Sequence, residues 1–331
     1  MAVVGCFFVT KKRRVIVRKK SKVEIEKDKC TGCKACQFAC PTDCISLVQG
    51  KAEFMDSFCL ACCHCEAACP ENAIKVQLGA EALTPFETIS VKDEWLEYGQ
   101  PETSGLIDLI RSRRSCRNFQ DKEVPKEMLR DLVRAAVWAP SATNVQTWTF
   151  TIIPNREGVK AFVKEVSKVY KEFNRLANKA VLRSVLKFFG RSELDDYYRG
   201  YYPFIKKRLK EMDEGGRDVF FRDAPAAIFV CGPKGLHSQD DALLATQNIL
   251  LTAHSMGLGS CLIGMANAAF RQEPKLHQYL GIPLTETVHS VVALGYPAEK
   301  YYRQPKRFAP VIRYKESSLV RCRRYLFKRP N

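Results

Sequence analysis

The sequence predicts an α+β protein with two domains of unequal size. A length of 331 residues suits two domains, and an apolar share of 46% is ordinary for a packed core. A cysteine-rich segment near the N-terminus repeats itself once, and after about residue 104 the pattern changes to longer amphipathic helices and short apolar strands. These observations predict a small duplicated domain followed by a larger mixed domain.

Composition excludes several protein classes. The longest early apolar run, 1–9, is far shorter than the ~18 residues that a membrane span needs, and its basic cluster follows the run, unlike in a secretory signal. The cysteine total of 15 is odd, which suits metal ligation in a reducing compartment better than a disulfide scaffold. We therefore expect a cytoplasmic protein without a membrane span.

The net charge of +17 is concentrated at the two ends. Residues 1–22 hold eight Lys or Arg and no acid, and residues 313–331 hold seven Lys or Arg and one acid. Such tails suit nucleic acid, anionic lipid or an acidic redox partner, or they are solvated extensions. No nucleic-acid-binding signature accompanies them, so we expect no nucleic-acid partner.

The duplicated segment carries two cysteine runs of the form C-x2-C-x2-C-x3-C-P, at 30–41 and 59–70. An iron–sulfur cubane needs four thiolates, of which three come from one tight loop and the fourth, before proline, crosses to the other cluster. One [4Fe–4S] cluster is expected on Cys30, Cys33, Cys36 and Cys69, and a second on Cys59, Cys62, Cys65 and Cys40.

Structural zinc is the competing interpretation, because C-x2-C pairs also suit tetrahedral zinc. Zinc ribbons need neither the third cysteine nor the cysteine before proline, so the pattern favours iron. Cys44 and Cys63 fall outside the spacing and are expected to be small buried residues. The segment resembles bacterial two-cluster ferredoxins, which implies a pseudo-twofold fold that relays single electrons.

The elements of the larger domain follow in order from periodicity and breakers. Pro85, Gly99 and Pro101 mark a linker, and apolar side chains at helical spacing predict a helix around 106–110 and another from Pro125 to near Pro140. Strands are predicted over 147–153, 226–230 and 288–294, with a long helix over 240–256.

Residues 156–222 are expected to be largely helical, basic and rich in aromatic side chains. They form either an extra helical layer or a lid over a substrate pocket, because aromatic rings stack on flat ligands. We expect these segments: a basic extension 1–21, a ferredoxin domain 22–79, a linker 80–103, the larger domain 104–312 with its insertion 156–222, and a basic tail 313–331.

Several cofactor motifs are missing from the larger domain. No G-x-G-x-x-G follows a strand and no P-loop is present, so neither a Rossmann site nor a nucleotide-triphosphate site is supported. The remaining cysteines, such as Cys116 and Cys261, are isolated and form no second cluster motif.

Other motifs are present in order. Residues 113–119 place three arginines and a serine after a short helix, and residues 139–148 read Ala-Pro-Ser-Ala-Thr-Asn-Val-Gln-Thr-Trp before a strand. Gln247-Asn248, the glycine-rich 257–264 and Leu-Gly-Tyr-Pro at 294–297 follow. In these motifs the chain resembles the nitroreductase family of flavin enzymes over residues 104–310, which implies an α+β domain that binds FMN.

The resemblance implies specific cofactor contacts. Arginines provide the bidentate donors that a phosphate requires, carboxamides fit the donor and acceptor edge of the flavin ring, and glycines permit a close approach. The FMN-contacting residues are expected to be Arg113, Arg114, Ser115, Arg117, Pro140, Ser141, Asn144, Gln146, Ile263 and Gly264, with Lys306 or Arg307 as a late phosphate contact.

Two positions depart from the family pattern. The usual proline before Trp148 is Thr147, and the large aromatic often found before Ile-Gly is Leu262. Both departures affect the expected shape of the flavin pocket without removing a charge. The family's flavin lies between subunits, so the resemblance also implies a homodimer.

The expected function is FMN-dependent reduction of an electron-poor small molecule, such as a nitroaromatic, a quinone or an activated alkene. Electrons would enter through the two [4Fe–4S] clusters from a ferredoxin-like carrier or NAD(P)H, and the cofactor supplies the chemistry. No side chain stands out as a catalytic acid or base. The alternatives are an electron-transfer or redox-sensing flavoprotein without turnover, and other flavin chemistry on the same fold.

Overall fold

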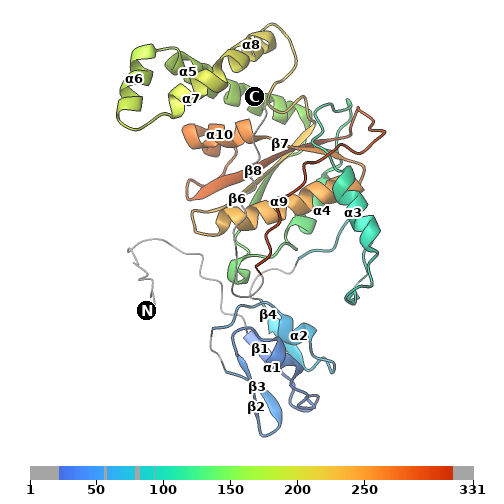
Figure 1. Ribbon diagram of the computed structural model, residues 1–331. Coiled ribbons are helices and arrows are strands. Elements are labelled where there is room, and N and C mark those ends of the chain that lie inside the picture. The colour runs from blue at the N-terminus through green and yellow to red at the C-terminus, as the bar shows by residue number, and fades with distance from the viewer. Residues whose placement is uncertain (1–21, 56–57, 79–82, 93, 316–331) are drawn as a thin grey trace. The chain divides into compact units, whose positions relative to one another are not determined.

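The computed structural model describes residues 22–55, 58–78, 83–92 and 94–315. It has the expected α+β class, with a small N-terminal domain and a larger domain around a four-stranded sheet (Figure 1). Residues 301–331 form a separate unit, of which 301–315 are described. The basic extension 1–21 and residues 316–331 of the tail lie outside the described residues. No helix in the described ranges combines the length and apolarity needed to cross a membrane.

The N-terminal domain repeats one unit of structure. Strand β1 pairs antiparallel with β4, and β2 pairs antiparallel with β3. Its elements are β1 (Lys22–Ile25), α1 (Ala35–Ala39), β2 (Ile45–Val48), β3 (Lys51–Phe54), α2 (His64–Ala67) and β4 (Ile74–Gln77). The residues before α1 and α2, Lys34 and Cys63, both adopt left-handed backbone, with φ 67° and 59°. The sequence duplication is therefore also a duplication of backbone conformation.

The larger domain is built on an antiparallel sheet in the order β5-β6-β8-β7. Its strands are β5 (Thr149–Ile153), β6 (Ala226–Pro233), β7 (Gly259–Leu262) and β8 (Glu286–Gly295). Strand β7 was not predicted, because four residues that include a glycine give too short a signal. The other three strands confirm the predicted ones, with ends shifted by at most three residues.

Side chains of β6 alternate between two apolar cores, as a strand covered on both faces requires. Ile228 lies in the core shared with α4 and α9, and Phe229 in the core shared with α5 and α10. Figure 1 shows α4 and α9 on one face of the sheet and the α5–α8 group with α10 on the other. The covering elements are α3 (Thr103–Ser112), α4 (Lys126–Ala136), η1 (Ala142–Asn144), α5 (Arg156–Ala177), α6 (Ala180–Phe188), α7 (Glu193–Gly200), α8 (Tyr202–Asp213), α9 (Ser238–Ser255), α10 (Gly264–Gln272) and α11 (Lys275–Tyr279).

The segment before the larger domain is anchored to α4 by a buried carboxylate. Asp131 is fully buried, and its oxygens accept hydrogen bonds from the backbone N–H groups of Glu87 and Thr88 at 2.6–3.1 Å. Arg134 donates to the same carboxylate at 2.8 Å. Part of the predicted linker is thus held against α4 of the larger domain, which composition alone did not reveal.

Candidate cofactor sites

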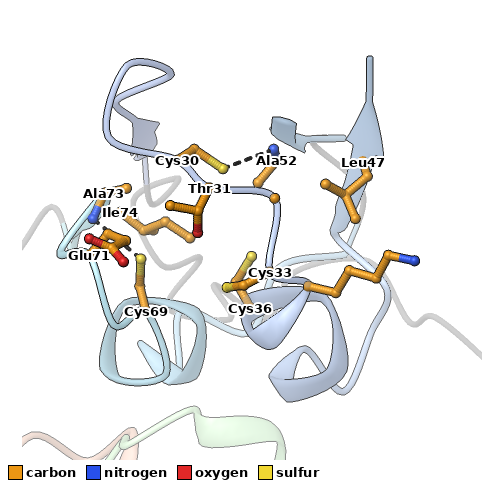
Figure 2. Close-up of a pocket in the computed structure, with 12 residues that line it drawn as sticks. Cys30, Thr31, Cys33, Cys36, Leu47, Ala52, Cys69, Glu71, Ala73 and Ile74 are labelled. Atoms are coloured by element: carbon orange, nitrogen blue, oxygen red, sulfur yellow. Dashed lines mark hydrogen bonds between the residues drawn. The ribbon is translucent and has the colours of Figure 1, made fainter. Parts of the chain in front are cut away.

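Four cysteines surround a hollow in the N-terminal domain, three from one loop and one from the other repeat. Figure 2 shows the sulfur atoms of Cys30, Cys33, Cys36 and Cys69 facing this hollow of about 350 Å³, which includes space open to solvent. A second hollow of about 350 Å³ is lined by the other four predicted ligands, Cys40, Cys59, Cys62 and Cys65. The fold therefore separates the eight cysteines into the two crossed sets that the spacing predicts.

The two hollows suit a multi-atom cluster better than a single ion. Among the described residues, no group of three or more His, Cys, Asp or Glu side chains lies close enough to hold one metal ion. Thiol groups placed around a hollow match a cubane, in which each iron takes one cysteine. The donor set and the space thus fit a [4Fe–4S] cluster on each side.

Backbone N–H groups point at the cysteine sulfurs. Ala73 donates to Cys69 Sγ at 3.3 Å, and Cys44 donates to Cys40 Sγ at 3.2 Å, so the two crossing ligands receive equivalent hydrogen bonds. Such bonds stabilise negative charge on sulfur and tune cluster potential. The bond from Ala52 N to Cys30 Sγ is the main cause of a lowered pKa for that thiol.

The two additional cysteines differ from the predicted ligands. Cys44 is buried and also lines the second hollow, with its Sγ 3.2 Å from the hydroxyl oxygen of Thr42. Cys63 also lines this hollow and lies 3.9 Å from the carbonyl oxygen of Ala61. The expectation of a small buried residue is therefore confirmed for Cys44 and wrong for Cys63, which is only half-buried at the wall of the hollow.

The expected phosphate turn follows the end of α3 and pairs with the edge of the sheet. Ser115 forms a parallel bridge with Ser260 of β7, and the N–H of Cys116 donates to the Ser260 carbonyl at 2.9 Å. A Cβ on Gly259 would lie 2.6 Å from Cys116 Sγ, so the turn can approach β7 this closely only because that residue is glycine. Burial raises the pKa of Cys116 to about 11, which makes it a neutral thiol at neutral pH.

The arginines of this turn have different surroundings. Arg114 donates to the carbonyl oxygens of Arg111 and Arg113, so its guanidinium caps the C-terminus of α3. Burial, and then the charge of Arg113, lowers the pKa of His254 on α9. Arg113, Ser115 and Arg117 therefore lie on one turn, while the guanidinium of Arg114 donates hydrogen bonds to carbonyl groups at the end of α3.

A second arginine loop, which no sequence motif predicted, lies against this turn. Arg217 donates to the Arg117 carbonyl at 2.6 Å and to the Arg222 carbonyl at 3.1 Å, which joins the two loops. Partial burial and then the like charge of Arg208, with smaller effects from Arg217 and Arg117, lower the pKa of Arg222. A cluster of cations that repel one another is a suitable site for an anion.

The local fold explains why this loop brings its arginines together. The buried carboxylate of Asp218 accepts hydrogen bonds from the N–H groups of Phe220 and Phe221 at 2.7 and 2.9 Å, and the next two residues, Arg222 and Asp223, adopt φ 60°. Phe220 and Phe221 are buried in the core. The sequence signal was the pair of arginines on either side of this apolar run, but only the fold brings them beside Arg117.

The turn expected to contact the flavin ring has an unusual backbone. Thr143, Asn144 and Gln146 have φ values of 49°, 55° and 47°, a left-handed conformation that costs free energy for residues with a Cβ and is concentrated at functional sites. Gln146 Nε2 donates to Asn144 Oδ1 at 2.7 Å. The buried Asp241 of α9 accepts from the N–H of Ala142 at 2.9 Å and so fixes the start of the turn.

Asn144 also joins the two parts of the site. Its Nδ2 donates to the carbonyl oxygens of Leu60 and Ala61 at 3.1 and 3.0 Å. These two residues lie between the predicted ligands Cys59 and Cys62. The residue expected to contact FMN is therefore also hydrogen-bonded to the ligand loop of the second hollow, which the sequence analysis did not anticipate.

The remaining predicted residues have varied positions. Ser141 Oγ accepts from the Gln146 N–H at 3.0 Å, and Pro140 is exposed before the turn. Ile263 is buried with its N–H bonded to the Val291 carbonyl at 2.8 Å, and a Cβ on Gly264 would meet no atom within 4 Å, so an open surface lies there. Lys306 and Arg307 are exposed in the separate unit, and their role stays a prediction.

Comparison with known proteins identifies both parts of the chain. Residues 110–296 match the model of the nitroreductase family, and residues 22–70 match the model of a 4Fe-4S dicluster domain. A Methanothermobacter thermautotrophicus protein whose name includes NADH dehydrogenase/NAD(P)H nitroreductase is 29% identical over 61% of this chain and 82% of its own. A 4-nitrobenzoate reductase from a Nocardioides species is 27% identical over 59% of this chain and 82% of its own.

Another relative and a solved structure match the same part of the chain. An iodotyrosine deiodinase from Thermotoga neapolitana is 27% identical over 63% of this chain and 97% of its own. A Bacteroides fragilis nitroreductase structure with bound FMN is 23% identical, covers 64% of this chain and 98% of its own, and has a TM-score of 0.47. The chain belongs to the nitroreductase family of FMN-dependent oxidoreductases and carries an N-terminal 4Fe-4S dicluster domain.

Proposed function

We propose that this oxidoreductase takes electrons through two [4Fe–4S] clusters and reduces an electron-poor small molecule such as a nitroaromatic, a quinone or an activated alkene. The observation that carries the proposal is the division of eight cysteines between two hollows, each lined by three ligands of one repeat and the last ligand of the other. When bound, the clusters supply single electrons and FMN supplies hydride transfer.

The cation cluster of the larger domain supports FMN binding. Arg113, Ser115 and Arg117 lie on one turn, and Arg222 reaches the same region from the loop joined to it by Arg217. A terminal phosphate with about two negative charges offsets the repulsion among these guanidinium groups. We assign the phosphate contacts to Arg113, Ser115, Arg117 and Arg222, and ring or ribityl contacts to Asn144 and Gln146.

The Asn144 contact supports electron exchange between the second cluster and the flavin. A single side chain of the flavin turn bonds to both carbonyl groups between Cys59 and Cys62. This bond holds the ligand loop against the turn that faces the ring. On this basis the cluster on Cys30, Cys33, Cys36 and Cys69 is the one that receives electrons from outside.

Exposed apolar side chains support the homodimer of the family. Leu106 and Ile110 on α3 and Leu243 and Leu244 on α9 are each more than 40% exposed, and α3 contacts α9. Single exposed apolar residues are common, but a patch on two adjacent helices marks an interface. We propose that this surface pairs with a second copy.

We also propose that the electron donor is a ferredoxin-like carrier or NAD(P)H. The proposed location of the protein is the cytoplasm.

The test starts with anaerobic purification and measurement of iron, sulfide and FMN on one sample. About eight iron atoms and one FMN per chain are expected. The reduced protein is then mixed with nitroaromatic, quinone and activated-alkene acceptors, and consumption of the acceptor is measured. Full cofactor content without consumption of any acceptor would favour an electron carrier or redox sensor instead.

A further inference from the structure

Helix α6 presents an apolar surface that no other described element covers. Val181, Val185, Phe188 and Phe189 are 78%, 47%, 86% and 73% exposed and recur at the spacing of one helical face and its end. We call these four residues the α6 ridge. Figure 1 shows α6 at the outer end of the helical group, away from the sheet.

The ridge is not needed to fold the helix. An adjoining face of α6 carries Leu182 and Leu186, which pack against a cluster containing Leu194 and Tyr202. The helix therefore already has an inner apolar face in contact with α5 and α7. Two adjacent phenylalanines that are almost fully exposed on its outer side indicate contact with something outside the described residues.

Cations flank the ridge at its two ends. Residues 178–192 contain Lys179, Arg183, Lys187 and Arg191 and no acidic residue. On α7, which packs against α6, the Asp195 carboxylate forms ion pairs with Arg183 and Lys187, each at 3.5 Å. Among the described residues no ion pair is formed by Lys179 or Arg191, which flank the ridge at its two ends.

We infer that the α6 ridge docks the protein on the surface of an anionic phospholipid bilayer, with α6 lying in the interface. Exposed aromatic and aliphatic side chains between cations are typical of interfacial helices, whose apolar side enters the headgroup boundary while Lys and Arg meet anionic lipid. The tip at Phe188 and Phe189 is followed by a glycine with φ 75° that turns the chain back. A protruding tip suits a deformable lipid surface.

Charge argues against a second copy of this chain as the partner of the α6 ridge. A twofold contact between two copies would place one basic 178–192 segment against its equal, and like charges repel. The ridge inference is independent of the proposed reaction, because none of its residues belongs to the cofactor sites.

The experiment uses the full-length protein loaded with both cofactors and vesicles of phosphatidylglycerol or phosphatidylcholine. Binding is measured by vesicle sedimentation at low salt and at a high salt concentration that screens the basic tails. The wild type is expected to bind phosphatidylglycerol at both salt concentrations. The double variant Phe188→Ser, Phe189→Ser is expected to bind about tenfold or more weakly at high salt, because only the apolar contribution resists screening.

The matched control is Leu236→Ser. It removes an apolar side chain that is 90% exposed and lies outside the α6 ridge. It should bind vesicles like the wild type, and both variants should keep their FMN content and melting temperature. In a second readout, Trp at position 188 (Phe188→Trp) should shift its emission to shorter wavelength with phosphatidylglycerol, whereas Leu236→Trp should not.

Three results would overturn the inference. The first is equal vesicle binding by the wild type and the double serine variant at high salt. The second is a double variant that binds vesicles normally but has a smaller oligomeric mass than the wild type in analytical ultracentrifugation, which would assign the ridge to a second copy. The third is normal vesicle binding with slower reduction by an acidic ferredoxin, which would assign it to a protein partner.

Discussion

At the residue scale, the two repeats share their ligands, because the last cysteine of each run lies beside the first three of the other. Cys69 lines the hollow of Cys30, Cys33 and Cys36, and Cys40 lines the other one. A short loop can present three thiolates to one cubane, but the fourth corner has to come from elsewhere in the fold. We therefore propose that sequence neighbours bind different clusters.

This crossing gives a spectroscopic prediction. Cys40→Ser and Cys59→Ser should affect the same cluster, while Cys69→Ser and Cys30→Ser should affect the other. Each single variant should lose up to about four of the eight iron atoms. Electron paramagnetic resonance of the reduced protein checks this: the first pair should share one residual spectrum and the second pair another. A residual spectrum shared by Cys40→Ser and Cys30→Ser would contradict the assignment.

Arg222 gives a second residue-scale prediction. Arg222→Ala should weaken FMN binding about tenfold or more, because a charge-assisted hydrogen bond to phosphate is worth about 1.5–3 kcal/mol. Riboflavin lacks the phosphate, so its affinity should change little. Fluorescence titration of the apoprotein with both flavins measures the two affinities, and Arg199→Ala on the exposed side of α7 is the control. An equal loss for both flavins would show that Arg222 acts only on the fold.

At the element scale, contacts between segments far apart in sequence hold the sites in place. The Asp131 carboxylate on α4 fixes the segment around Glu87, and Gly259 on β7 lets the phosphate turn approach the sheet. Neither residue carries chemistry. Both determine where the elements that carry chemistry lie.

Asp131 should make stability depend on pH. Burial opposes its ionisation, but hydrogen bonds from Thr88 and Glu87 outweigh burial and lower its pKa from 3.8 to about 2. Because the folded-state pKa is below the ordinary value, this contribution is complete above pH 3.8 and is lost as the pH falls through about 2. Asp131→Asn should lower the free energy of unfolding at neutral pH by about 2 kcal/mol or more.

Denaturant unfolding of the wild type and Asp131→Asn between pH 7 and pH 2 checks this dependence. The difference between the two proteins should shrink as the pH falls below 3.8. A difference that stays constant over the whole range would show that the Asp131 charge contributes nothing.

Gly259 gives a steric prediction with a built-in control. Gly259→Ala places a Cβ 2.6–2.7 Å from Cys116, so the turn or the strand has to move, at a cost of about 1–3 kcal/mol of stability. Gly200→Ala, outside the predicted FMN contacts, meets no atom within 4 Å and should fold normally with unchanged FMN content. Thermal unfolding and FMN content are measured for both. Unchanged melting of Gly259→Ala would mean that the turn does not lie this close to β7.

At the scale of the whole molecule, the larger domain has two apolar cores, and its surface on α3 and α9 exposes the apolar side chains of Leu106, Ile110, Leu243 and Leu244. Pairing of this surface with a second copy would remove it from water. Leu106→Asp with Ile110→Asp should therefore convert the dimer to a monomer, because a buried charge without a partner is costly. Analytical ultracentrifugation measures the mass, and Leu236→Asp is the control. A dimer that persists would place the interface elsewhere.

Much of the fold was predictable from particular residues. Periodicity gave α3, α4 and α9 to within a few residues at most ends, and alternating or continuous apolar runs gave β5, β6 and β8. Strand β7 was missed because glycine and short length hide a strand. Arg217, Arg222 and Asp131 were missed because a charged side chain gains its meaning from a partner that is distant in sequence.

The sequence by itself indicated the chemistry: the cysteine spacing predicts iron–sulfur ligation, and the arginine and carboxamide turns carry the resemblance to a family that binds FMN. These are local patterns, since the cofactor demands particular donors at short spacing. Only the tertiary structure decided which arginine loop lies beside Arg117, which ligand loop meets Asn144, and which face of α6 stays uncovered. Such contacts depend on chain segments brought together by packing of the cores, and no local pattern encodes them.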